Sequence, residues 1–307
     1  MTNSSLAVET NELRKVYNNG FVAVDGLTLA VPAGQIFGFL GPNGAGKTTT
    51  INMLLSNVYP TSGSYSVLGS RMGDVKARGR LGFLPEKFQF HEFLSASEFL
   101  DLHGRLYGMS SELRKKRIPE TLELVGLADR SKSKIREFSK GMQQRVGLAQ
   151  AILNDPDLII LDEPTSALDP LGRRDVRDIV RHLKSQGKTI FLNSHLLGEI
   201  ELTCDEIAIM KKGRIVRQGK IDDLLAAPSH VSMRVLSASE QLLAKLREQT
   251  RTLEHSIETD TIDVAIASDD EIPALVSTIV NNGGRLMSLI PQRESLEDLF
   301  IRIVEET

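Results

Sequence analysis

The sequence of 307 residues contains a single cysteine, Cys204. One cysteine cannot form a disulfide within the chain, and such sparse use is typical of proteins kept in a reducing compartment. For Cys204 itself, the role of a small apolar residue in the core is favoured over a reactive role.

Long apolar runs are also missing. No uninterrupted apolar stretch approaches the roughly 20 residues that a membrane-spanning helix needs. The first residues, Met1–Glu9, have neither the basic start nor the apolar centre of a secretory signal peptide. We therefore expect any role at a membrane to depend on a partner protein.

An excess of charge of one sign is absent as well. The 37 Lys and Arg residues nearly balance the 40 Asp and Glu residues, which leaves a net charge of −3. Basic runs such as Arg114–Arg117 are short and are interpreted as the solvated face of a helix. This balance indicates no nucleic-acid partner, and the composition is that of a globular protein with one large or two moderate domains.

A glycine-rich stretch at residues 41–49 is the most informative motif that is present. It fits the pattern GxxxxGK[ST], follows the strand-like run Gln35–Leu40, and opens a predicted helix through Leu55. In that context backbone amides and the positive end of the helix can cradle a polyphosphate. Lys47 would neutralise the β- and γ-phosphates, and the Thr48 hydroxyl would hold Mg²⁺. The residues predicted to contact nucleotide are Gly41, Pro42, Asn43, Gly44, Ala45, Gly46, Lys47, Thr48 and Thr49.

Two acids follow the most apolar strand of the sequence. Leu158–Leu161 are four aliphatic residues in a row, and Asp162 and Glu163 come directly after them. Acids at this end of a parallel strand lie where doubly wound sheets bind ligands, and they are costly to bury without a cation. Asp162 suits a Mg²⁺ role, and Glu163 could orient and polarise an attacking water. His195 follows a similar predicted strand, so we expect it to contact the γ-phosphate.

The remaining patterns predict the arrangement of the chain. Residues Ala7–Val31 alternate like two antiparallel strands joined by a turn, and His91–Leu153 read as a helical insertion into an α/β core. After a linker at 226–229 the pattern resets to βαββαβ plus a helix, the ferredoxin-like order. That last part carries no catalytic motif, so packing or dimerisation is favoured over ligand sensing.

Together, and in this order, the motifs resemble the ATP-binding cassette of ABC transporters. The resemblance covers about Leu6–Leu225. It implies an α/β P-loop NTPase in which a RecA-like core carries an antiparallel β-subdomain and a helical subdomain at about 90–155. The predicted domains are this cassette, 1–228, and a small ferredoxin-like α+β domain, 229–307.

The resemblance also assigns roles that spacing alone leaves open. Tyr17, otherwise a half-exposed strand aromatic, matches the residue that stacks on adenine. Phe138–Gln143 stands where the signature sequence stands, which implies phosphate contacts for Ser139 and Gly141 rather than only a capped helix. Ser166–Asp169 is similar to the D-loop.

Four further positions are matched or altered. His195 matches the switch histidine. Glu86 takes the Q-loop position, where the family has glutamine, and could still reach Mg²⁺. In the signature, Lys140 replaces a glycine and Met142 a glutamine. With these changes, and with residues 36–38 and 294–300, the sequence resembles cassettes of the bacterial export-type branch.

The function implied is an ATPase with ATP and Mg²⁺ as cofactors. Two cassettes would work head to tail as a homodimer or heterodimer, on the cytoplasmic face of the membrane, driving export through a separate transmembrane permease. A soluble ABC-type ATPase acting on ribosomes or DNA is the alternative, disfavoured because the chain has one cassette and no sustained heptads. A P-loop kinase or GTPase lacks an identifiable acceptor pocket or guanine-reading motif.

Overall fold

The structure is a computed structural model that describes residues 5–71, 73–166, 168–225, 230–250, 252–266, 268–292 and 295–305. The chain divides into two compact units, Met1–Lys220 and Ile221–Thr307. The predicted boundary at 228/229 falls within residues 226–229, which lie outside the described residues.

A mainly parallel six-stranded sheet forms the centre of the first unit, with strand order β10-β9-β3-β8-β7-β6. Four neighbouring pairs are parallel, and the β9–β10 hairpin is antiparallel. Every residue of β3, β7 and β8 is buried. The strands are β3 (Ile36–Leu40), β6 (Leu81–Leu84), β7 (Leu158–Asp162), β8 (Thr189–Asn193), β9 (Glu206–Lys211) and β10 (Arg214–Lys220).

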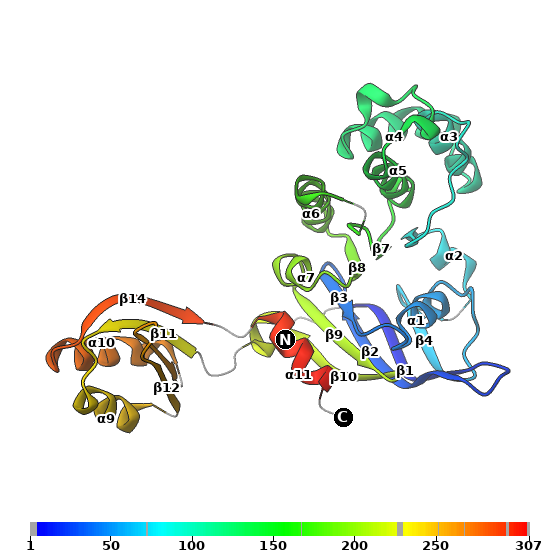
Figure 1. Cartoon of the computed structure of the whole chain (residues 1–307). Helices are drawn as coiled ribbons and strands as arrows, with labels where there is room; N and C mark the ends of the chain where they lie inside the picture. Colours follow the sequence, from blue (N-terminus) through cyan, green and yellow to red (C-terminus); the bar gives the residue numbers. More distant parts are fainter. Residues whose placement is uncertain are drawn as a thin grey trace. The chain divides into compact units, whose positions relative to one another are not determined.

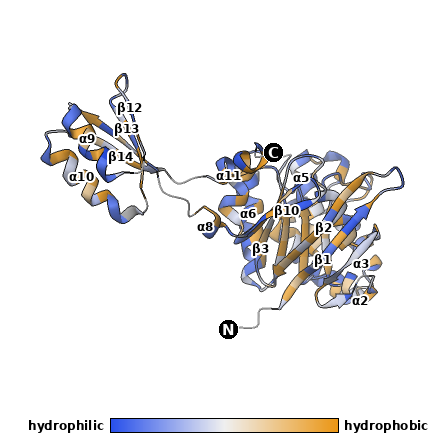
Figure 2. Cartoon of the chain, turned by 90° about the horizontal axis from the view of Figure 1, so that it is seen from below, coloured by the Kyte–Doolittle hydropathy of each residue, from blue (hydrophilic) through white to orange (hydrophobic). Residues whose placement is uncertain are grey.

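The second sheet of this unit has the order β2-β1-β4-β5 and is antiparallel. Its strands are β1 (Leu6–Val16), β2 (Val22–Pro32), β4 (Ser62–Val67) and β5 (Ser70–Arg71). Helix α1 (Lys47–Leu54) contacts β2 and β4. One apolar core includes Leu29 of this sheet, Ile51 of α1 and Phe191 of the central sheet, so both sheets enclose the first turns of α1. The hydrophobic colouring of these strands is visible in Figure 2.

Helices of the first unit fall into two groups. α3, α4 and α5 pack on one another, and α5 also contacts β6, whereas α6 contacts β3 and β8 (Figure 1). The helices are α2 (Val75–Arg78), α3 (Ala96–Leu106), α4 (Ser111–Leu124), α5 (Lys140–Ile152), α6 (Pro170–Ser185) and α7 (Leu197–Thr203), with 3₁₀ turns at Ala128–Arg130 and Ile135–Glu137. Among the described residues, no helix is long and apolar enough to cross a membrane.

The second unit contains a four-stranded antiparallel sheet of order β12-β13-β11-β14. In chain order its elements are α8 (Ile221–Leu224), β11 (His230–Leu236), α9 (Glu240–Gln249), β12 (Thr252–Ser256), β13 (Thr261–Ala265), α10 (Ile272–Asn281), β14 (Arg285–Gln292) and α11 (Leu296–Glu305). From β11 to β14 this is βαββαβ with the strand order of the ferredoxin-like fold. Its core packs Val231, Met233 and Val235 against Leu242 and Ile279.

Candidate functional site

The glycine-rich loop lies between the end of β3 and the start of α1. Gly46 precedes the helix with φ 109°, and a Cβ at this position would lie 2.3 Å from the carbonyl oxygen of Ala23. A Cβ at Gly41 would lie 2.4 Å from the carbonyl oxygen of Met210. Since neither backbone oxygen can move cheaply, both positions require glycine. The Gly213 N–H also donates to the Ala45 carbonyl at 2.9 Å, which ties the loop to the β9–β10 hairpin.

Lys47 is folded over this loop. Its Nζ donates to the Gly41 carbonyl at 2.6 Å and to the Pro42 carbonyl at 3.2 Å. Burial lowers the pKa of Lys47, and the charges of Glu163, Asp162 and Glu86 oppose that shift. The loop lysine and these three acids, which come from three separate stretches of sequence, therefore lie within electrostatic range of one another.

Asp162 ends β7 and is 5% exposed. Burial raises the pKa of this carboxyl, and the hydrogen bond from the side chain of Asn193 acts against that shift. The two residues are partners in the parallel register of β7 and β8. A buried carboxylate held in this way is a candidate ligand for a hard cation.

Glu163 takes an unusual backbone conformation directly after the strand. Its φ is +54°, in the left-handed region that non-glycine residues rarely adopt. Its N–H donates to the Asn193 carbonyl at 2.8 Å, and its Oε2 lies 2.7 Å from Nδ1 of His195. The Glu163 side chain is 12% exposed and that of His195 is 63% exposed. Strain of this kind concentrates at functional sites, and here it accompanies a carboxylate paired with an accessible imidazole.

Tyr17 lies at the other end of the loop. Its hydroxyl is 3.4 Å from Oγ1 of Thr49, its ring is 38% exposed, and the Lys15 ammonium is 5.3 Å from the ring centroid. An exposed ring next to the phosphate loop is placed suitably for stacking on a base.

The signature segment occupies the start of α5. Ser139 caps this helix by accepting from the Met142 N–H, and a Cβ at Gly141 would lie 3.2 Å from Leu168. Asp169 caps α6 by accepting from the Gly172 N–H at 2.8 Å, whereas Ala167 of the predicted D-loop lies outside the described residues. Within the described ranges, no hydrogen bond joins the first turn of α5 to residues 41–49.

The structure thus groups most of the predicted site. Lys47, Glu86, Asp162, Glu163 and His195 gather at the carboxyl ends of the central strands, while Ser139 and Gly141 belong to a separate helix end. Sequence reasoning missed Asn193, which contacts Asp162 through its amide and Glu163 through its carbonyl. Its place two residues before His195, on the strand beside the acids, was the available signal.

The donor set of the site fits Mg²⁺. The groups near the loop lysine are carboxylate, amide and hydroxyl oxygens, which hard cations prefer. The amide oxygen of Asn193 is buried and has no hydrogen-bond partner in the described part of the chain. The described residues contain no cluster of three or more His, Cys, Asp or Glu side chains that could hold a metal. Mg²⁺ keeps several waters and is held in part by substrate phosphates, so one or two protein oxygen ligands are enough to hold it.

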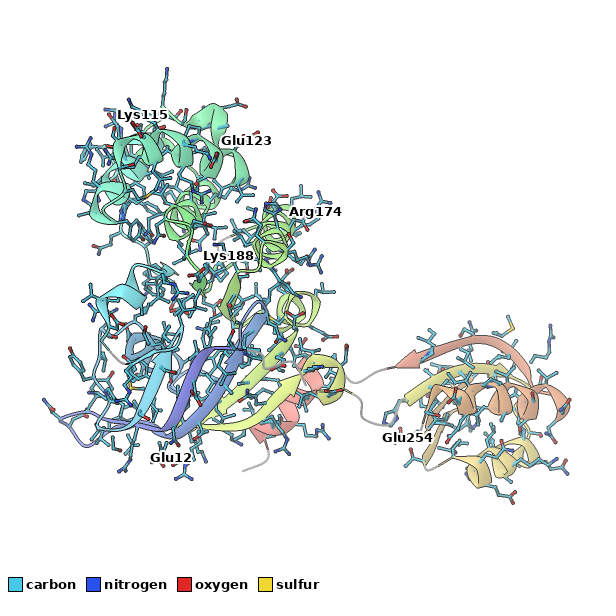
Figure 3. The ribbon with its side chains drawn as sticks, turned by 180° about the vertical axis from the view of Figure 1, so that it is seen from behind. Glu12, Lys115, Glu123, Arg174, Lys188 and Glu254 are labelled. Carbon is cyan, nitrogen blue, oxygen red and sulfur yellow. The ribbon has the colours of Figure 1, made fainter. Side chains whose placement is uncertain are left out.

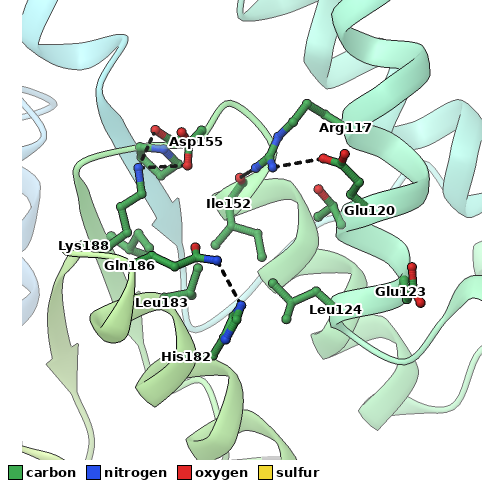
Figure 4. A pocket seen from close by; sticks show the side chains of 13 residues that line it. Arg117, Glu120, Glu123, Leu124, Ile152, Asp155, His182, Leu183, Gln186 and Lys188 are labelled. Atoms are coloured by element: carbon green, nitrogen blue, oxygen red, sulfur yellow. Dashed lines mark hydrogen bonds and ion pairs between the residues drawn. The ribbon is translucent and has the colours of Figure 1, made fainter.

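A polar cleft of about 350 Å³ lies elsewhere in this unit, beside the ends of α4, α5 and α6 (Figure 4). Arg117 donates there to the carbonyls of Ile152 and Leu153, and Lys188 pairs with Asp155 at 2.8 Å. None of the predicted site residues lines it. The cleft therefore lies where the helical cluster meets the sheet core. The hydrogen bonds from Arg117 satisfy backbone carbonyl groups at the end of α5.

Burial of the Asp162 carboxyl leads to a prediction about the stability of the folded chain. Because burial raises its pKa, the folded state favours the protonated form, so stability is lost as pH rises through the folded pKa. We expect Asp162→Asn, without nucleotide, to raise the melting temperature at pH 7 by roughly a few degrees. The gain should shrink as pH is lowered toward the ordinary Asp pKa of about 3.9.

The exposed residue Asp129, changed to Asn, is the matched control and should leave the melting curve unchanged. A lower melting temperature for Asp162→Asn at pH 7 would contradict the prediction. Differential scanning calorimetry of both variants between pH 5 and pH 8 provides the measurement.

Comparison with known proteins places this geometry in a family. The family model described as ABC transporter matches residues 24–166. An uncharacterized ABC transporter ATP-binding protein of Nostoc sp. is 41% identical over 99% of this chain and 91% of its own length. The bacitracin transport ATP-binding protein BcrA of Bacillus licheniformis is 34% identical over 98% of each chain, and the linearmycin resistance ATP-binding protein LnrL of Bacillus subtilis is 33% identical over 98% of this chain and 99% of its own.

Solved structures give the same result for the fold. The structure of an ATP-binding subunit of an ABC transporter is 33% identical, with a TM-score of 0.66 over 72% of this chain and 92% of that one. A dimeric cassette, MJ0796, in a post-hydrolysis state with ADP and Pi is 28% identical, with a TM-score of 0.64 over 70% of this chain and 98% of that one. The P-loop NTPase fold is the one expected from the sequence. The chain belongs to the ATP-binding proteins of ABC transporters, and it is an ATPase.

Proposed function

We propose that the chain drives export of a substrate through a separate transmembrane permease, and that it does so as a dimer of cassettes bound to the cytoplasmic face of the membrane. The observation that carries the proposal is the convergence of Lys47, Asp162, Glu163 and His195 at the end of one sheet. The direction is supported by the names of three relatives, which describe bacitracin transport, linearmycin resistance and Nod factor export.

In the proposed mechanism the loop amides and Lys47 hold the β- and γ-phosphates, and Tyr17 stacks on adenine. Glu163 accepts a proton from, or orients, the attacking water, and His195 fixes the carboxylate through the 2.7 Å contact and faces the γ-phosphate. Mg²⁺, when bound, would supply neutralisation of the charge on the triphosphate. Thr48 and Asp162 are the residues proposed to hold it, with Glu86 as a further carboxylate.

The dimer is supported by the position of the signature helix. Ser139 and Gly141 lie at the positive end of α5, which makes no hydrogen bond to the loop of its own chain within the described ranges. That helix end is available to the triphosphate of a second cassette, where it would add positive potential. Two solved structures of one relative, MJ0796, are described as dimeric. Every proposed catalytic position is present in this one chain, so a homodimer would have two complete sites.

A groove of about 350 Å³ supports the permease contact. It is formed by the end of α1, β6, α3 and α5, and is lined by Leu55, Phe83, Phe88, His103 and Tyr107 among others. Phe88 also packs against Phe90 and Phe99, with ring centroids 4.6 and 5.9 Å apart. An aromatic groove beside the segment that follows Glu86 suits a short helix from a membrane subunit.

The cassette is assigned to 1–228 and an accessory packing domain to 229–307 as part of the same proposal.

Affinity purification from detergent-solubilised membranes tests the partner. The wild-type chain should elute with a protein that has several transmembrane segments, and that protein should stimulate ATP hydrolysis in liposomes. Arg78→Glu at the rim of the groove should reduce its recovery at least about tenfold, whereas Lys115→Glu on the exposed face of α4 (Figure 3) should not. Elution with ribosomes or DNA instead of a membrane subunit would overturn the transport proposal.

Replacement of the loop lysine tests the nucleotide site separately. Lys47→Ala removes a partly buried ammonium that already donates to two loop carbonyls, so ATP affinity should fall. Loss of charge-assisted hydrogen bonds worth about 1.5–3 kcal/mol corresponds to a decrease of about 10- to 100-fold. Lys188→Ala, at the ion pair with Asp155 in the polar cleft, is the control and should bind ATP normally. Isothermal titration calorimetry with ATP measures both, and equal affinities would count against the role of Lys47.

A further inference from the structure

We propose that Asn193 is a positioning residue for the Mg²⁺ site. Its side-chain NH₂ group fixes Asp162, and its side-chain amide oxygen accepts from a water bound to Mg²⁺. The inference rests on the proposed role of Asp162 and adds a residue that no motif contains.

The first observation is the pairing of Asn193 with both acids. Asn193 Nδ2 donates to Oδ1 of Asp162, and the Asn193 backbone carbonyl accepts from the N–H of Glu163 at 2.8 Å. One residue at the end of β8 therefore sets the position of the carboxylate on β7 and of the glutamate that follows it. His195, two residues further along the chain, holds Glu163 from its side-chain end at 2.7 Å.

The second observation fixes the orientation of the amide. The NH₂ group of Asn193 donates to Asp162, which leaves the amide oxygen facing away from it. This is the orientation that suits a carboxylate bound to a cation, because an ionised carboxylate only accepts hydrogen bonds. That oxygen is buried without a partner in the described part of the chain, in a side chain that is only 3% exposed. A buried amide oxygen left without a donor is unfavourable, and native proteins retain few of them.

The third observation is the place of Asn193 in the central sheet. Asn193 is in register with Asp162 on one side and with Phe39 of β3 on the other, one residue before Leu40, where β3 ends and the loop begins. Asn193 thus sits on the strand between the one that leads into the phosphate loop and the one that ends in Asp162, and its side chain contacts Asp162. A water bound to Mg²⁺ is a strong donor, and it is the partner that this site lacks.

The amide bond to Oδ1 also has a consequence for Asp162. Because one carboxylate oxygen is occupied by Asn193, the other is left to face the cation or its water shell. Partners of this kind behind a metal ligand typically contribute 10- to 100-fold to metal affinity.

The experiment separates metal-dependent from metal-independent nucleotide binding in the full chain. Asn193→Leu keeps the approximate volume but removes both the donor and the acceptor. The affinity for ADP without Mg²⁺, set by the loop and Tyr17, should stay within about twofold, whereas the Mg²⁺ concentration needed to saturate a non-hydrolysable ATP analogue should rise at least about tenfold. Asn193→Asp, which offers a carboxylate in place of the donor, should lower the melting temperature without cation, and Mg²⁺ with the analogue should restore it by more than in wild type.

Asn154→Leu is the matched control. Asn154 also has a buried amide oxygen without a partner among the described residues, and its Nδ2 donates to the Gly79 carbonyl at 2.9 Å, before β7 rather than after it. This variant should lose stability without changing the Mg²⁺ requirement.

Equal decreases in metal-free and metal-dependent affinity, in both Asn193 variants, would reduce Asn193 to a structural role and overturn the proposal. An unchanged Mg²⁺ requirement would overturn it as well. If Asn193→Leu does not fold, the Mg²⁺ titration of Asn193→Asp decides by the same criteria. The permease is not needed for these measurements, so a wild-type chain that binds nucleotide with normal Mg²⁺ dependence but fails to export would refute only the proposed function.

Discussion

Glu163→Gln should reduce ATP hydrolysis by about a thousandfold while ATP affinity changes by less than about threefold, since a positioned general base typically contributes 10²–10⁴-fold. The substitution keeps the size of the side chain and its ability to hydrogen bond to Nδ1 of His195, now 2.7 Å from Oε2. It removes only the capacity to accept a proton or to polarise water. With hydrolysis blocked, the nucleotide should hold two cassettes together, so a dimer should accumulate in the presence of ATP and Mg²⁺.

Steady-state phosphate release and size-exclusion chromatography with ATP measure these effects. Glu123→Gln, on the exposed face of α4 (Figure 3), is the matched control and should behave as wild type. Turnover within about threefold of wild type for Glu163→Gln would remove the glutamate from the proposed chemistry and leave His195 or a phosphate oxygen to activate the water.

The sequence was sufficient to predict the elements of the site because each follows a local rule. Four aliphatic residues before Asp162 predicted the buried strand β7, and the strand–loop–helix context predicted the loop that ends at Lys47. The βαββαβ order of the second unit was also predicted, and its strand order β12-β13-β11-β14 agrees with the ferredoxin-like fold. These features depend on periodicity and turn residues over short stretches.

The sequence could not predict contacts that depend on lateral register. Asn193 meets Asp162 only because β7 and β8 pair with those two residues side by side, and no local pattern contains that pairing. The left-handed backbone of Glu163 is similarly hidden, since nothing in the residue type favours φ of +54°.

Pro119 lies inside α4, where propensity alone would end the helix. Burial of Ile118, Thr121 and Leu122 offsets that preference through tertiary packing.

The register of the parallel strands also explains how residues from separate sequence motifs are held together in one site. The parallel pairing of β7 with β8 brings Asp162 beside Asn193, and the pairing of β8 with β3 carries the same edge toward the loop. The tie between Ala45 and Gly213 supports the loop from the β9–β10 hairpin. Substitutions that disturb the loop should therefore act on both nucleotide binding and stability.

Gly46→Ala should show this coupling most strongly. Gly46 has φ 109°, and a Cβ would lie 2.3 Å from the Ala23 carbonyl oxygen and 2.7 Å from Cε of Met210. The methionine end can move, but the backbone carbonyl belongs to β2 and cannot move without disturbing the sheet. Strain from the left-handed conformation, about 1–2 kcal/mol, adds to overpacking of about 1–3 kcal/mol. We expect a loss of roughly 2–5 kcal/mol in unfolding free energy and no measurable ATP binding, because α1 can no longer begin at Lys47 in its present position.

Gly44→Ala separates the two causes within the same loop. Gly44 has φ +77°, but no atom lies within 4 Å of its would-be Cβ, so this variant carries only the conformational strain. It should lose about 1–2 kcal/mol and still bind ATP, since the backbone amides keep their positions. Urea unfolding followed by circular dichroism, together with calorimetric titration of ATP, measures both variants. Equal destabilisation by Gly44→Ala and Gly46→Ala would show that backbone conformation alone sets the requirement for glycine. A larger loss at Gly46 is the result expected if the close approach to Ala23 decides it.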